Sequence, residues 1–158
     1  MSHHDRLANQ TPEQALTTAR IVWAALLLGV LTVTGIMIAM TLQSPPQPTG
    51  IDWFFIGLPA ALLVMAAGIG HVVRQQVYKA GWVNHVVNPK AYVTGLIIYL
   101  AALEGVCVIA AIFMVIGAPM IPSLLIIGVG LALMAINFPN GKPMFPPDRD
   151  RRIGNFDA

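Results

Sequence analysis

The stretch that decides the fold is residues 92–116, YVTGLIIYLAALEGVCVIAAIFMVI, in which Glu104 is the only charged residue. At a rise of about 1.5 Å per residue, a helix over this stretch is long enough to cross a hydrocarbon layer about 30 Å thick. Glu104 would then lie near the middle of that layer, where a carboxylate is costly and by default marks a functional site. The sequence therefore predicts a membrane helix with a candidate site at its centre.

The composition is that of an integral membrane protein. The chain is 56% hydrophobic and 10% charged, with a mean hydropathy of +0.71, whereas soluble domains carry about 25% charged residues. The net charge of +2 does not indicate binding to nucleic acid, because the cations lie where membrane edges are expected. A single cysteine, Cys107, excludes an intramolecular disulfide and a cysteine-based metal site. With no nucleotide-binding or redox motif either, we expect no metal, no cofactor and no catalytic residue.

Four segments are long and apolar enough to predict an all-α, integral membrane four-helix bundle. The breaks between them contain proline and glycine, which end helices. The expected spans are about 21–40, 53–73, 92–116 and 121–138. They form one transmembrane domain, residues 21–138, between an N-terminal tail (1–20) and a proline-rich C-terminal tail (139–158).

All nine lysine and arginine residues fall on one side of this predicted bundle. They precede the first span, lie between the second and third, or follow the fourth, and the other two connections contain none. By the positive-inside rule, loops with this excess of cations face the cytoplasm. The sequence thus predicts a multi-pass protein of the inner (cytoplasmic) membrane, surrounded by the lipid bilayer, with both termini in the cytoplasm.

Two connecting segments carry weaker signals. The connection from His71 to Lys90 mixes valine and tryptophan with polar residues. It is expected to extend the second helix out of the membrane and then to follow the membrane surface. Residues 139–147 contain four prolines, and since proline disfavours a helix, this segment is expected to be extended.

Small residues are frequent in the second, third and fourth spans. Between membrane helices they permit close approach of the backbones, because burial away from lipid brings no hydrophobic gain. The high frequency of small residues predicts close packing of the helices, either within one bundle or between the copies of an oligomer. The candidate helix-packing positions are Gly68, Gly70, Ala101, Gly105, Gly128 and Gly130.

The surroundings of Glu104 are predicted by counting depth along the other spans. Residues three and four positions away on its own helix cannot pair with a carboxylate. Thr32 and Thr34 of the first span fall near mid-membrane and could donate a hydrogen bond to Glu104. No basic side chain is expected at that depth, which favours the neutral carboxylic acid over the ion.

One family pattern can be compared with the middle of the chain. Residues 68–76 read GIGHVVRQQ, and Leu103-Glu104-Gly105 follow in the next span. This region, about residues 60–116, resembles the c subunit (proteolipid) of rotary ATP synthases, which has a glycine-rich helix, a cytoplasmic Arg-Gln-Pro loop and a carboxylate midway along its second helix. The resemblance implies that Glu104 is an ion-binding carboxylate. It also implies a c-like hairpin within a small bacterial membrane protein, whose first and fourth helices have no counterpart in a two-helix c subunit.

Two functions follow as hypotheses. The leading one is a non-enzymatic membrane subunit or scaffold, packed as a homo-oligomer or within a larger membrane complex, with Glu104 as a buried polar anchor. The alternative is a proteolipid that translocates protons or cations and uses Glu104 as the carrier. An anchor should tolerate glutamine, which still forms hydrogen bonds, whereas a carrier should not.

Overall fold

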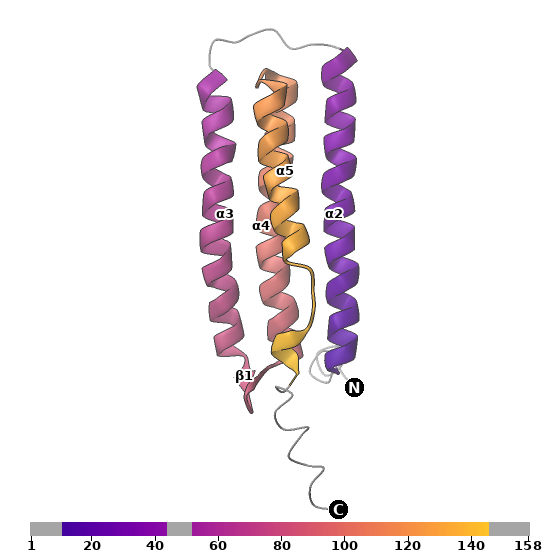
Figure 1. The fold of residues 1–158 in the computed structure, drawn as a ribbon, viewed down its shortest axis with the longest axis vertical. Coiled ribbons are helices and arrows are strands. Elements are labelled where there is room, and N and C mark those ends of the chain that lie inside the picture. Colours follow the sequence, from indigo (N-terminus) through magenta and orange to yellow (C-terminus); the bar gives the residue numbers. More distant parts are fainter. Residues whose placement is uncertain (1–10, 44–51, 146–158) are drawn as a thin grey trace, which may run out of the picture.

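The computed structural model describes residues 11–43 and 52–145, and these residues form four helices, one short hairpin and one turn of 3₁₀-helix (Figure 1). The elements are α2 (Pro12–Gln43), α3 (Asp52–Ala80), β1 (Trp82–Val83), β2 (Val86–Val87), α4 (Pro89–Ile116), α5 (Met120–Ile136) and η1 (Lys142–Met144). The all-α architecture predicted from the sequence is confirmed.

Helix α4 occupies the centre of the bundle. In Figure 1, α2 and α3 lie on opposite sides, and α5 lies against α4 between them. Eleven of the 28 residues of α4 are buried, compared with five of the 32 residues of α2. Helices α2 and α3 therefore expose most of their apolar side chains, and α4 contributes most of the buried residues.

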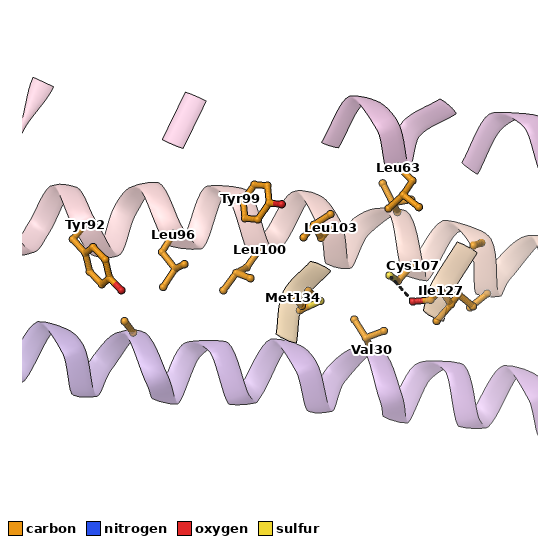
Figure 2. Packing of buried hydrophobic residues seen from close by; sticks show 14 of the residues in the cluster. Val30, Leu63, Tyr92, Leu96, Tyr99, Leu100, Leu103, Cys107, Ile127 and Met134 are labelled. Atoms are coloured by element: carbon orange, nitrogen blue, oxygen red, sulfur yellow. Dashed lines mark hydrogen bonds between the residues drawn. The ribbon is translucent and has the colours of Figure 1, made fainter. Parts of the chain in front are cut away.

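The core follows α4 along its length (Figure 2). Leu100 and Leu103 are fully buried on this helix. Val30 of α2, Leu63 of α3 and Ile127 of α5 belong to the same cluster, so each of the other helices contributes to the core around α4.

Three of the helices are long and apolar enough to cross a membrane: α2, α3 and α4. Helix α5 is shorter, with 17 residues, which corresponds to about 25 Å and is less than a full hydrocarbon layer. The expected fourth span ran to Phe138, but the helix ends at Ile136. Pro139, which has no amide hydrogen to donate, follows shortly after that end.

The start of α2 also differs from the sequence-based boundary. The helix begins at Pro12 rather than near Ile21, so residues 12–20, assigned above to the N-terminal tail, are helical. Thr11 and Gln14 form a reciprocal cap: the Gln14 amide donates to Thr11 Oγ1 and the Thr11 amide donates to Gln14 Oε1, each at 3.3 Å. Such a capping box satisfies two amides that the first turn leaves without a partner.

The connection between α3 and α4 is a β-hairpin that the sequence analysis did not predict. Helix α3 does continue to Ala80, beyond the expected span. Trp82 then pairs with Val87, and Val83 pairs with Val86. The two turn residues, Asn84 and His85, both have positive φ angles, of 49° and 66°, as a two-residue hairpin of type I′ requires.

The segment after α5 packs back on the bundle. Met144 of η1 is 3% exposed, and the amide of Gly141 donates to the hydroxyl of Tyr92 at 3.2 Å. Gly141 has a φ of +73°, a conformation that glycine adopts without strain. This part of the predicted C-terminal tail is a docked segment with a 3₁₀ turn instead of a uniformly extended chain. The rest of that predicted tail, residues 146–158, lies outside the described residues.

Candidate functional site

Glu104 lies near the middle of α4 and points toward α2. Its Oε1 atom lies 3.2 Å from the position that a Cβ atom would occupy on Gly29. Gly29 is itself near the middle of α2. The carboxyl group therefore lies midway along two membrane-length helices and between them, and the absence of a side chain on Gly29 makes room for it.

The two threonines predicted as partners lie elsewhere on α2. Thr32 is exposed, and Thr34 is buried at 9% exposure. Within the described residues, neither threonine donates a hydrogen bond to Glu104, and no other described side chain does so; the threonine hydrogen bonds found in α2 are to its own backbone, as in Thr41 to the Met37 carbonyl at 2.8 Å. The carboxyl group thus has no donor in the described part of its own chain.

The direction of the helices explains this arrangement. Helices α2 and α4 run the same way along the bundle (Figure 1). Because side chains on a helix lean toward its N-terminus, the Glu104 carboxyl reaches back toward Gly29 and away from Thr32 and Thr34. Counting positions along each span identifies α2 as the neighbouring helix, but it does not account for the direction in which the Glu104 side chain leans. The helix direction and the lean together were the signal that could have identified Gly29.

The predicted small packing residues divide into two groups. Gly70 and Gly130 are buried at helix contacts, where an added Cβ atom would meet Tyr99 in the first case and the Cys107 sulfur in the second. At the other three glycine positions, an added Cβ atom would have no neighbouring atom within 4 Å. The exposed positions are Gly68, Ala101, Gly105 and Gly128. Four of the six candidates therefore lie on the outer surface of this chain.

Cys107 lies one turn from Glu104 on α4. It is fully buried, and its thiol faces the Ile127 carbonyl at 3.9 Å (Figure 2). Among the described residues, no three histidine, cysteine, aspartate or glutamate side chains come together as a group that could hold a metal ion. The carboxyl group of Glu104 and the thiol of Cys107 are thus close together on α4.

No known protein family, curated protein or solved structure matches the chain. The resemblance of its central region to the c subunit of rotary ATP synthases stays a prediction. The function is therefore argued from the geometry of Glu104.

Proposed function

We propose that this protein is a non-enzymatic integral membrane subunit that assembles with further copies of itself or with other membrane proteins, and that Glu104 is the polar anchor of that assembly. The proposal includes insertion into the cytoplasmic membrane. Three membrane-length apolar helices support insertion, and so does the exposure of large apolar side chains, such as Val64 at 74% and Ile121 at 74%. We also propose that the end of the bundle with the lysine and arginine residues, where α3 ends and α4 begins, faces the cytoplasm.

One observation carries the assignment of Glu104. Its carboxyl group lies at mid-depth, and the described residues of the chain offer it no hydrogen-bond donor. Polar groups at this depth are expensive unless they pair, and membrane helices commonly pair them across an interface. Glu104 is only partly buried, so a donor from a neighbouring chain has access to it. The outward-facing Ala101 and Gly105 on the same helix would let that neighbour approach closely.

The same partly exposed carboxyl group supports the second candidate, an ion carrier. A group without a fixed donor is free to exchange a proton or a cation. The two candidates differ in what a glutamine at this position should do. Glutamine keeps the hydrogen-bonding capacity of the side chain and loses its ability to bind and release a proton.

The test compares the native mass of the full chain in mild detergent for wild type, Glu104→Gln and Glu104→Leu. The mass is followed over a dilution series, and we expect the Gln variant to dissociate at the wild-type concentration and the Leu variant at a higher one. A hydrogen bond between membrane helices contributes about 1 kcal/mol, so removing one should lower the association constant about fivefold. Glu13→Leu is the matched control, because it makes the same substitution at an exposed site in the first turn of α2.

Proton flux into liposomes containing the same four proteins separates the candidates. Flux that is present in wild type and absent in an intact Gln assembly assigns Glu104 as a carrier. If the Leu variant dissociates at the same concentration as wild type, the anchor role is wrong.

A further inference from the structure

A second polar site lies at the end of the bundle where α3 ends and α4 begins. Arg74 of α3 lines a cavity of about 180 Å³ between α3, α4 and the segment after α5. Its Nη1 donates to Asn137 Oδ1 at 2.7 Å, and its Nη2 is 3.3 Å from His71 Nδ1. The Nε–H group is buried and has no partner among the described residues. In the sequence, Arg74 is one of the nine cations that predict orientation, and it lies within the stretch that resembles the c subunit.

The position of Arg74 is held from several sides. The Nδ2 atom of Asn137 donates to the Leu133 carbonyl at 2.8 Å, which orients its Oδ1 atom toward Arg74. The guanidinium lies 4.9 Å from the centre of the Tyr99 ring. An added Cβ atom on Gly95 would lie 2.8 Å from the Tyr78 ring and 3.3 Å from Arg74 Cγ, so the glycine lets both α3 side chains lie close against α4. Packing and hydrogen bonds therefore hold the arginine at the cavity, where its side chain is partly buried.

The charged side chains around the cavity are all positive. No carboxylate lines it among the described residues, and its other polar lining groups include Tyr78, Tyr92 and Asn140. An adjoining cavity of about 390 Å³ shares Tyr78 and is lined by Lys79 and Lys142. The guanidinium is partly buried and its Nε–H group has no partner among the described residues, which leaves a hydrogen-bond donor free for an anion. Guanidinium and phosphate form strong, often bidentate hydrogen bonds.

We propose that the Arg74 cavity binds a phosphate group, with Arg74 as its principal ligand and the neighbouring Lys79 and Lys142 adding attraction. The cavity lies at an end of membrane-length helices, where headgroups of anionic lipids are found. Apolar side chains line both cavities, among them Ile136 in the first and Trp82 in the second. A phospholipid headgroup and a soluble phosphate share this chemistry, and the experiment below separates them.

The experiment measures binding to the full-length protein in a mild, uncharged detergent by native mass spectrometry. Phosphatidic acid, phosphatidylcholine and inorganic phosphate are titrated separately. We expect Arg74→Gln to lower the affinity for the bound phosphate probe about tenfold to hundredfold, since hydrogen bonds to charged groups contribute about 1.5–3 kcal/mol. Arg20→Gln is the matched control. Arg20 is also an arginine beside an aromatic ring, 5.6 Å from Phe138, and its Nε already donates to the Pro139 carbonyl at 3.4 Å.

Asn137→Asp is the second variant, and it keeps Arg74 in place. The new carboxylate would stand beside Arg74 Nη1 and neutralise it, so this variant should lose phosphate binding while the helical circular dichroism remains. Binding of phosphatidic acid in preference to the other two probes assigns a lipid headgroup, and binding of inorganic phosphate without phosphatidic acid assigns a soluble ligand. The proposal is overturned if wild type binds neither, or if Arg74→Gln and Asn137→Asp bind as tightly as Arg20→Gln.

Discussion

Two glycines of α5, only two residues apart, have opposite surroundings. Gly130 is buried against Cys107 of α4, and an added Cβ atom would collide with the Cys107 sulfur. Gly128 is exposed, and an added Cβ atom would meet nothing within 4 Å. In sequence the two look equivalent, because both are small residues in an apolar helix. The direction in which each residue points decides whether it sets the distance between α4 and α5.

This difference predicts opposite effects of the same substitution. Gly130→Ala should destabilise the protein by about 1–3 kcal/mol, the usual range for overpacking a close contact. Gly128→Ala should leave stability unchanged or raise it by up to about 1 kcal/mol, because alanine has the higher helix propensity. Thermal unfolding in detergent, followed by circular dichroism, measures both. Adding Cys107→Ala should restore stability to the Gly130→Ala protein. Equal midpoints for the two single variants would contradict the assignment of Gly130 to the contact.

Helix α5 ends inside the bundle, and side chains of α2 satisfy the backbone there. The indole nitrogen of Trp23 donates to the Met134 carbonyl at 2.8 Å, and Arg20 donates to the Pro139 carbonyl. Trp23 also packs edge-to-face on Phe138, with 5.0 Å between ring centres. Carbonyl groups at the end of a helix need such partners when water is excluded. Because of these hydrogen bonds, α5 can end before the longer helices do without leaving its last carbonyl groups unpaired.

Removing the indole hydrogen bond should therefore loosen the end of α5. Trp23→Phe keeps an aromatic ring and loses the donor, so we expect a decrease of about 0.5–1.5 kcal/mol in the free energy of unfolding. Trp53→Phe is the matched control, because Trp53 is 87% exposed, and it should change stability by less than about 0.5 kcal/mol. Unfolding in mixed micelles with increasing denaturing detergent reports both. An unchanged Trp23→Phe protein would show that this hydrogen bond does not stabilise the end of α5.

Across the whole molecule, charge is distributed unevenly. The described lysine and arginine residues lie toward the end where α3 finishes and α4 begins, and the described part of the opposite end has none. With three membrane-length helices between the two ends, this distribution supports the proposed orientation. The Arg74 cavity and the proposed phosphate ligand would then face the inner leaflet.

The orientation predicts which end of α3 is accessible from outside the cell. Trp53→Cys and Lys79→Cys place a thiol near the two ends of this helix, at positions that are both exposed. In intact cells, a membrane-impermeant maleimide should label the first, and it should label the second only after lysis. The parent protein, whose single Cys107 is fully buried, serves as the control for background labelling. The reverse pattern would contradict the proposed topology.

Much of this fold is encoded locally. The apolar runs, their lengths and the proline breaks determined the helices, since each depends on the composition of one segment. The boundaries were less predictable. Thr11 and Gln14 start α2 earlier than hydropathy indicates, and the hairpin turn at Asn84 and His85 carries no glycine, the residue that usually marks such a turn.

The sites depended on contacts between segments distant in sequence. The sequence by itself determined that Glu104 lies midway along an apolar helix. Only the tertiary structure placed Gly29 opposite it, because helix direction and side-chain lean decide which residue a carboxyl group reaches. The tertiary structure also brings Asn137 next to Arg74. It places Gly68, Gly105 and Gly128 on the outer surface. Hydropathy indicates where along the chain an apolar helix runs, whereas the rotation of each helix about its axis is decided by packing.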